Sequence, residues 1–252
     1  MIFADISRRT ALALIGAAVI SSAALAQAED RRMIVLINPN SSENATKAMT
    51  KLAQDAVGND FIVEGRSNSS APALLTTPAD MAAAIPGVVA IGIDAARNPK
   101  VGALIVSAFS DPGLPELRKA VDIPVFGIGE EVFHEAAKHG RPFGIVTVTP
   151  DPALIASFKE KAASLGYAQQ YRGTRVTPGE PKALVDDPAL LDAALAEAVK
   201  QSQAEDGTAA IIMGGGPLSD AALRLQPQFE TPLVVAVTAA ARAAARAMAD
   251  QN

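Results

Sequence analysis

Short apolar runs alternate along the chain with longer stretches of helical periodicity. The runs contain few polar residues, as expected of strands that are buried on both faces of a parallel sheet. A helical stretch after each run is typical of βαβ units. The pattern predicts strands at 33–37, 60–65, 103–107, 124–128, 143–148, 167–175, 209–213 and 233–237. It predicts helices at 43–57, 78–98 with an interruption around Pro86-Gly87, 115–121, 130–139, 153–165, 187–203 and from Thr238 onward.

One order of elements occurs twice. A polar turn begins at Asn38 after the first strand and near Thr147 after the fifth, and each half has a later small-residue turn, at Ala108 and at Gly215. The separation between the two turns is nearly the same in both halves. This spacing indicates two similar α/β lobes that face each other. Chance remains the alternative here, because every α/β protein alternates strands and helices.

The N-terminal residues have the layout of an export signal. Arg8 and Arg9 precede an apolar run at 11–25, which is shorter than the roughly 20 residues that a membrane span needs. A small-residue cleavage motif, AQA, follows at 26–28. We expect residues 1–28 to be a twin-arginine signal peptide that is cleaved near Ala28. The mature chain would then be periplasmic or secreted, with no stable membrane span. The alternative is an uncleaved N-terminal anchor.

Composition excludes several kinds of site. The chain has no cysteine, so it has no disulfide, thiolate metal site or thiol nucleophile, and its two histidines make a multi-histidine metal site improbable. The net charge of -5, with no basic block, argues against nucleic acid as a partner. The glycine triplet at 214–216 is not followed by Lys-Ser/Thr, so it is not a P-loop. The sequence therefore predicts no cofactor and no metal, and a small molecule as the partner.

Several polar or glycine-rich turns lie at predicted strand ends, where open parallel sheets bind their ligands. Amide, hydroxyl and free backbone N–H groups in such turns suit a small anionic ligand. Candidate substrate-binding residues are Asn40, Ser41, Ser110, Thr147, Thr149, Gly214, Gly215 and Gly216. Candidate catalytic residues are Asp111, Glu130 and Ser107. The alternative is that these residues only form turns, helix caps and solvated helix surface.

Five segments, at 34–42, 108–114, 123–130, 143–149 and 210–216, resemble the aspartate/glutamate/hydantoin racemase family, and hydantoin racemases in particular. The resemblance implies an α/β fold of two pseudo-symmetric Rossmann-like lobes, with parallel sheets and an interlobe cleft that holds the active site. The first lobe would comprise residues 29–125 and be completed by 231–252. The second lobe would comprise residues 126–230. The resemblance also implies a substrate-binding role for Asn40, Ser41 and residues 147–149.

The chain departs from the family at both catalytic cysteines. The resemblance implies two thiols on opposite faces of the substrate α-carbon, and it places these positions at Ala108 and Gly215. Neither side chain carries a transferable proton, so a two-thiol mechanism is excluded. We therefore expect an exported enzyme of the superfamily that acts on a small carboxylate or hydantoin-like compound by non-cysteine chemistry. The alternative is a non-catalytic periplasmic binding protein on the same fold. The alanine-rich C-terminal helix would suit contacts in a homo-oligomer.

Overall fold

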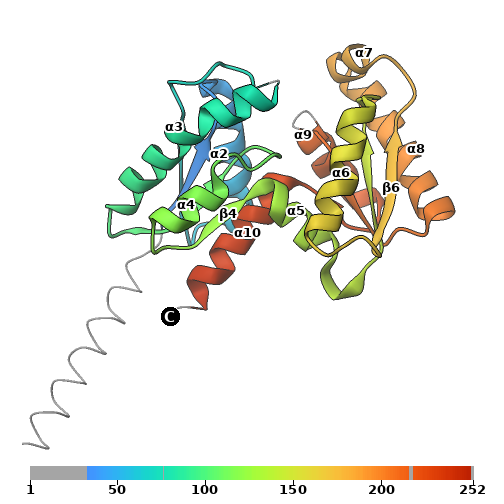
Figure 1. Cartoon of the computed structure of the whole chain (residues 1–252). Helices are drawn as coiled ribbons and strands as arrows, with labels where there is room; N and C mark the ends of the chain where they lie inside the picture. Colours follow the sequence, from blue (N-terminus) through green and yellow to red (C-terminus); the bar gives the residue numbers. More distant parts are fainter. Residues whose placement is uncertain (1–32, 76, 216–217, 251–252) are drawn as a thin grey trace, which may run out of the picture.

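The computed structural model describes residues 33–75, 77–215 and 218–250, and the predicted signal peptide lies outside the described residues. The described chain forms two lobes side by side, each built on a four-stranded parallel sheet (Figure 1). The strand order is β2-β1-β3-β4 in the first sheet and β6-β5-β7-β8 in the second. The two orders are the same, so the predicted fold of two similar α/β lobes is confirmed.

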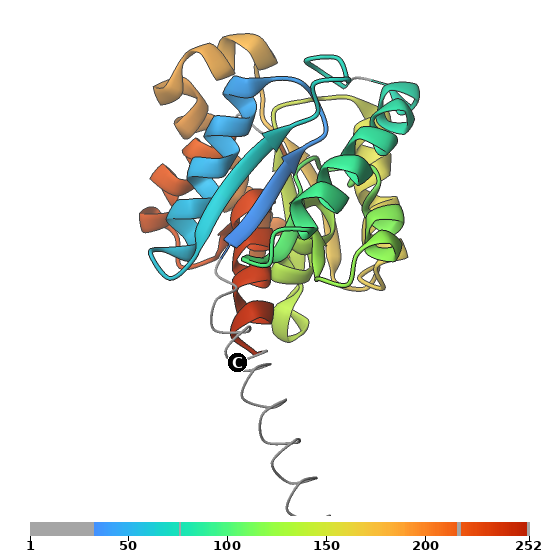
Figure 2. The same cartoon turned by 90° about the vertical axis from the view of Figure 1, so that its left-hand side faces the viewer.

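The first sheet consists of β1 (Met33–Asn38), β2 (Ile62–Ser67), β3 (Val101–Val106) and β4 (Val125–Gly127). Its first three helices are α2 (Glu43–Val57), α3 (Pro78–Ala96) and α4 (Leu114–Ala120). Alternate residues of β1 point to opposite faces, so Leu36 packs with α2 whereas Ile37 packs with α3 and α4. Figure 2 shows the sheet between these helices. Coverage of both faces explains why β1 and β3 are continuously apolar.

The second sheet consists of β5 (Phe143–Thr147), β6 (Tyr171–Val176), β7 (Ala210–Met213) and β8 (Leu233–Val234). Its helices are α6 (Pro152–Ser164), α7 (Pro181–Asp186), α8 (Pro188–Asp206) and α9 (Leu218–Leu225), with short 3-10 turns at Lys138–Gly140 and Gln226–Gln228. One face of this sheet packs against α8 and α9, and the other packs against α6. Sheet order and helix placement thus repeat those of the first lobe.

Two helices cross between the lobes. Helix α5 (Ile128–Ala136) directly follows β4 of the first sheet, but its Val132 and Phe133 pack on the second sheet. Helix α10 (Ala236–Ala249) directly follows β8, but its Ala240 and Ala244 pack on the first sheet. Within the segment that the sequence assigned to the first lobe, β8 and α10 therefore pack on different sheets. Strand β8 pairs with β7 in the second sheet, and α10 alone returns.

Backbone hydrogen bonds show which residues of the two lobes are equivalent. The N–H of Ser107 donates to the carbonyl of Ile37 at 2.8 Å, and the N–H of Gly214 donates to the carbonyl of Val146 at 2.8 Å. These bonds join equivalent points of the two sheets, one residue before Ala108 and Gly215 respectively. The two positions that the resemblance assigns to cysteines are therefore equivalent in the fold, which resolves the choice between duplication and chance.

The observed helices differ from the predicted ones at α3, α7 and α9. Helix α3 runs without interruption through Pro86. The side chain of Asn68 lies against the next residue, Gly87, and donates to the carbonyl of Ala84 at 3.2 Å. Helices α7 and α9 were not predicted. Within the described residues, α3 is also the one helix long and apolar enough to cross a membrane, but its Val88 belongs to the core of the first lobe.

Candidate functional site

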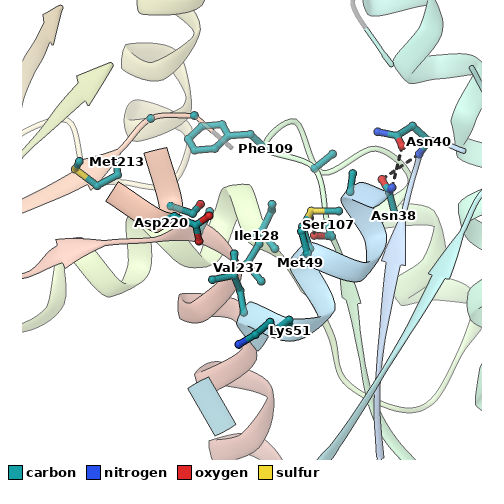
Figure 3. Close-up of a pocket in the computed structure, with 18 of the residues that line it drawn as sticks. Asn38, Asn40, Met49, Lys51, Ser107, Phe109, Ile128, Met213, Asp220 and Val237 are labelled. Carbon is teal, nitrogen blue, oxygen red and sulfur yellow. Dashed lines mark hydrogen bonds between the residues drawn. The ribbon is translucent and has the colours of Figure 1, made fainter. Parts of the chain in front are cut away.

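A cavity of about 970 Å³ lies between the lobes, at the carboxyl ends of the strands. Its size is in the range of sites for small organic molecules. Figure 3 shows side chains from both lobes around it. The lining residues are Asn38, Asn40, Ala45, Ala48, Met49, Lys51, Leu52, Asp55, Leu74, Ser107, Ala108, Phe109, Ile128, Thr149, Leu154, Phe158, Met213, Gly214, Gly215, Ser219, Asp220, Leu223, Ala236 and Val237.

Equivalent positions of the two lobes line this cavity in pairs. Asn40 corresponds to Thr149 in the turn after the first strand of each lobe. In the helix that follows, Met49 of α2 corresponds to Phe158 of α6. Ala108 and Gly215 form a further pair, and both line the same cavity. The two positions that the resemblance assigns to thiols thus lie on opposite lobes of one site.

Asn38 and Asn40 form a rigid turn in the first lobe. The buried Nδ2 of Asn38 donates to Asn40 Oδ1 at 2.8 Å and to Thr46 Oγ1 at 2.9 Å. Asn40 Oδ1 also accepts from the N–H of Ser42 at 2.9 Å, and Ser42 caps helix α2. Because both contacts use Oδ1, the Nδ2 group of Asn40 has no partner among the described residues. This donor remains available to a ligand.

Ser107 brings a hydroxyl to the cavity, beside the first position that the resemblance assigns to a thiol. The side chain is buried, and its Oγ donates to Met49 Sδ at 3.0 Å. Sulfur is a weak acceptor, so a ligand oxygen competes easily for this hydroxyl. Ser107 is thus the one predicted catalytic residue that lines the cavity.

Gly214 and Gly215 differ in the space around them. A Cβ atom at Gly214 would meet Ile145 Cγ2 at 2.8 Å, so a side chain there is excluded without movement. A Cβ atom at Gly215 would first meet Leu218 Cγ at 3.5 Å, an ordinary contact. The second thiol position is therefore sterically able to hold a side chain. Gly216, the third predicted glycine, lies outside the described residues.

The other predicted binding residues divide between the cavity and its supporting shell. Thr149 lines the cavity. Thr147 is buried behind it, where its Oγ1 donates to the carbonyl of Gly214 at 3.0 Å and accepts from the N–H of Thr149 at 3.2 Å. Ser41 and Ser110 do not line the cavity; Ser110 is exposed, and its Oγ donates to Met81 Sδ at 3.1 Å. Thr147 is thus a supporting residue that joins the two turns of the second lobe.

Asp111 points away from the cavity. Its carboxylate accepts from the N–H of Gly129 at 2.8 Å and pairs with Lys161 Nζ of the second lobe at 2.7 Å. Burial raises the pKa of Asp111, and Lys161 and the Gly129 N–H act in the opposite direction. The residue has a positive φ of 52°, which the two contacts hold. The structure therefore gives Asp111 an interlobe structural contact rather than a place beside a ligand.

Glu130 also lies outside the cavity, in a cluster on α5. Its carboxylate pairs with Arg118 at 2.6 Å. Burial and the charge of Glu130 raise the pKa of the neighbouring Glu131 to about 7. His134 Nδ1 lies 2.7 Å from the hydroxyl of Tyr167. The possible ligand atoms of Glu130, Glu131 and His134 lie within 4.8 Å of one another, but Arg118 already neutralises one of the two carboxylates.

Charged groups occur at the cavity on α2 and α9. Lys51 and Asp55 of α2 pair at 2.6 Å and are largely exposed. Asp220 lies in the first turn of α9.

Sequence reasoning did not single out Lys51, Met49 or Phe158 as lining residues. The similar spacing of the two halves of the sequence was the available signal for Met49 and Phe158, because it makes Met49 on α2 equivalent to Phe158 on α6.

Comparisons with known proteins agree with this geometry. The family model described as Asp/Glu/Hydantoin racemase matches residues 34–244. The hydantoin racemase of Rhizobium meliloti is 29% identical over 211 residues, which cover 84% of this chain and 86% of that protein. The hydantoin racemase of Paenarthrobacter aurescens is 26% identical, with 84% and 89% covered. The structure of an allantoin racemase from Klebsiella pneumoniae superimposes with a TM-score of 0.74 at 27% identity, with 86% and 87% covered.

The family model spans both lobes and includes each of the strand ends that line the cavity. The match therefore concerns the whole described fold and not a single motif. The chain belongs to the Asp/Glu/hydantoin racemase family.

Proposed function

We propose that this protein is a racemase-family enzyme that binds a neutral, hydantoin-like ring between its lobes and moves a proton at a ring carbon without a thiol. The observation that carries the proposal is the pairing of Ala108 and Gly215 on opposite sides of one cavity. The site thus retains the two-sided geometry of the family, although the chain has no cysteine.

The chemical character of the lining supports a neutral ring. Asn40, Ser107 and Thr149 offer amide and hydroxyl groups, which suit the carbonyl and N–H groups of a cyclic imide or urea. Among the described residues, Lys51 is the one cationic side chain that lines the cavity, and it already pairs with Asp55 at 2.6 Å. A dicarboxylate would therefore find little charge compensation. The hydantoin and allantoin racemases to which the chain is similar are consistent with this choice.

Apolar side chains make up much of the remaining wall and favour a ring that carries an apolar substituent. They come from both lobes and include Met49, Ile128, Leu154, Phe158 and Met213. Burial of an apolar substituent against such a wall contributes roughly 25 cal/mol per Å² of area removed from water. We therefore expect 5-alkyl and 5-benzyl hydantoins to bind more tightly than allantoin.

The chemistry follows from the acidity of a ring C–H next to a carbonyl. Removal of this proton leaves an enolate whose negative charge rests mainly on the carbonyl oxygen. The free Nδ2 group of Asn40 and the hydroxyl of Ser107 are donors that can stabilise such an oxygen. Return of a proton to the opposite face of the carbon then inverts its configuration.

Proton NMR of the purified protein in heavy water tests the proposal. Hydantoins, allantoin, aspartate and glutamate are added separately, and the α-proton of each is followed against a blank without protein. We expect enzyme-dependent exchange with a 5-substituted hydantoin and none with aspartate or glutamate. Exchange of aspartate or glutamate alone would contradict the neutral-ring assignment.

A second function, ligand binding without catalysis, is favoured by one observation: both thiol positions are occupied by residues that carry no transferable proton. The same spectra distinguish the two functions. Broadening of ligand signals without exchange supports a binding protein, whereas exchange of any bound ligand excludes a purely binding role.

We also propose that the protein is exported by the twin-arginine route. The arginine pair, the short apolar run and the small-residue motif of residues 1–28 support this proposal. Expression of the whole chain, followed by cell fractionation and N-terminal sequencing, should give a periplasmic protein that begins at Glu29. Replacement of Arg8 and Arg9 by lysine should leave the precursor in the cytoplasm. Unchanged export of that variant would contradict the route.

A further inference from the structure

The cavity needs a proton acceptor, because Ala108 and Gly215 supply none. The carboxylates nearest to the site are mostly engaged elsewhere. Asp111 accepts from Gly129 and Lys161 outside the cavity. Glu130 pairs with Arg118 at 2.6 Å, and Asp55 pairs with Lys51 at 2.6 Å. Each of these ion pairs would have to break before its carboxylate could accept a proton from a ligand.

Asp220 is different from these carboxylates. It lines the cavity from α9, the helix that follows the turn at Gly215. It makes no hydrogen bond or ion pair with any residue in the described part of the chain. Figure 3 shows its carboxylate among the lining side chains, on the side of Ile128 and Val237. Its oxygens are therefore open to a ligand or to water.

We propose that Asp220 is the catalytic base that takes the ring C–H proton in place of the missing thiol. This inference rests on the proposed function. Asp220 and Gly215 both belong to the second lobe, and α9 follows the turn at Gly215. Asp220 therefore replaces the proton acceptor that is missing on the second side of the site. Among the described residues of the first lobe that line the cavity, the one carboxylate, Asp55, is paired with Lys51, and the hydroxyl of Ser107 is too weakly basic to remove a carbon-bound proton unaided.

The charged and polar groups near Asp220 come from both lobes. Asp220 is the third residue of α9, where unpaired backbone N–H groups stabilise a negative charge. Lys51 lies on the opposite lobe, and the charge of Asp220 contributes to raising the pKa of Lys51, after the larger effects of the hydrogen bond and charge of Asp55. A carboxylate is a sufficient base where hydrogen bonds stabilise the enolate that forms.

The proposed step is balanced within the site. The ring C–H bond breaks, its proton forms an O–H bond with Asp220, and its electron pair forms the enolate. The protonated Asp220 returns a proton to the same face and restores the original configuration. A water molecule that protonates the opposite face gives the mirror-image product, and hydroxide then regenerates ionised Asp220 with the release of water. Neither route requires a redox partner.

A single base predicts a specific kinetic signature. Asp220 exchanges its proton with solvent, so deuterium enters the ring carbon each time the original configuration is restored. Inversion requires the separate protonation by water. Exchange should therefore be faster than loss of optical rotation. Two facing bases would instead couple each inversion to one exchange.

The test uses the purified protein with an optically pure 5-benzylhydantoin in heavy water. Exchange is measured by proton NMR and inversion by polarimetry, each against a blank without protein. Asp220→Asn should lower enzyme-dependent exchange by at least about 100-fold, the usual contribution of a general base. Line broadening of the ligand should be unchanged, and Asp220→Glu should restore part of the rate. Glu116→Gln is the matched control, because Glu116 is, like Asp220, an exposed carboxylate at the third residue of a helix, but it does not line the cavity.

The outcomes separate the two proposals. Fast exchange in the parent protein and in Asp220→Asn alike would overturn the role of Asp220 and leave the proposed function standing. Ligand broadening without exchange in the parent protein would overturn the proposed function, and the role of Asp220 with it. Equal rates of exchange and inversion in the parent protein would contradict the single base. An unchanged thermal melt of Asp220→Asn shows that a lost rate is not lost folding.

Discussion

The Ala108→Cys/Gly215→Cys double variant tests the two-sided geometry most directly. Both positions line the interlobe cavity from equivalent strand ends. A Cβ atom at Gly215 finds Leu218 Cγ at 3.5 Å and Leu218 Cδ1 at 3.7 Å, so the Cβ of a cysteine makes only ordinary contacts there. Loss of the glycine also reduces the conformational freedom of the unfolded chain, which offsets small packing changes. We expect the free energy of unfolding to change by less than about 1 kcal/mol.

The expected gain is catalytic. A positioned acid–base group contributes about 10²–10⁴-fold to a proton transfer, and the double variant supplies one thiol on each side of the ring carbon. Racemisation of a 5-substituted hydantoin should therefore rise at least about 100-fold over the parent protein. Each inversion should now introduce one deuterium atom at the ring carbon. The assay is polarimetry with NMR in heavy water, with a reductant present because facing thiols can oxidise to a disulfide.

Two controls define the result. Gly214→Cys adds a thiol one residue away, but its Cβ would meet Ile145 Cγ2 at 2.8 Å, which should destabilise the fold by about 1–3 kcal/mol. Each single cysteine variant should show exchange without coupled inversion. A folded double variant with two titratable thiols and no gain in racemisation would refute the assignment of Ala108 and Gly215 to opposite faces of one substrate.

Three further predictions concern stability and binding. Lys161→Ala leaves the buried Asp111 carboxylate unpaired and should lower the free energy of unfolding by about 3–5 kcal/mol in urea denaturation; an unchanged midpoint would show that the pair contributes nothing. Burial and the charge of Glu130 raise the folded-state pKa of Glu131 to about 7 from its ordinary 4.5. The contribution of protonated Glu131 to the stability of the fold is therefore complete below pH 4.5 and is lost as the pH rises to 7. Glu131→Gln should flatten that slope and add about 1–2 kcal/mol above pH 7, allowing for partial exposure; a parallel pH profile would contradict this. Asn40→Asp keeps the Oδ acceptor that Ser42 uses but removes the Nδ2 donor, so ligand affinity should fall about tenfold with little change in melting temperature; a matching loss of stability would instead indicate a turn defect.

The sequence predicted the architecture well because parallel strands buried on both faces are continuously apolar. The runs at β1, β3 and β7 are of this kind, and each was placed within about two residues of its observed bounds. Helix starts were equally clear where a capping residue precedes them, as Ser42 does for α2 and Asp187 for α8. Local rules failed at Pro86, which lies inside α3 although proline usually interrupts or ends a helix.

The candidate site, like the fold, was predicted only in part from the sequence. Sequence alone determined that the chain has no thiol chemistry. The strand-end pattern and the resemblance together directed attention to Asn40, Ser107, Thr149, Gly214 and Gly215, which line the cavity, and also to Ser41 and Thr147, which do not. The sequence did not determine which polar residues near a strand end face a ligand. Asp111 and Glu130 were attractive carboxylates by position, yet each is engaged by a partner distant in sequence, Lys161 and Arg118 respectively.

Only the tertiary structure decided these orientations. A turn sequence fixes where a side chain begins, but whether it points into a cavity or toward another lobe depends on which helix packs beside it. Helices α5 and α10 exchange between the lobes, so the neighbours of a strand end come from distant parts of the chain. The sequence by itself determined the alternation of strands and helices and the absence of cysteine, and it indicated the duplication that the two sheets then established. The packing of one lobe against the other determined the cavity and left Asp220 as its unpaired carboxylate among the described residues, because contacts between residues far apart in sequence leave no local pattern.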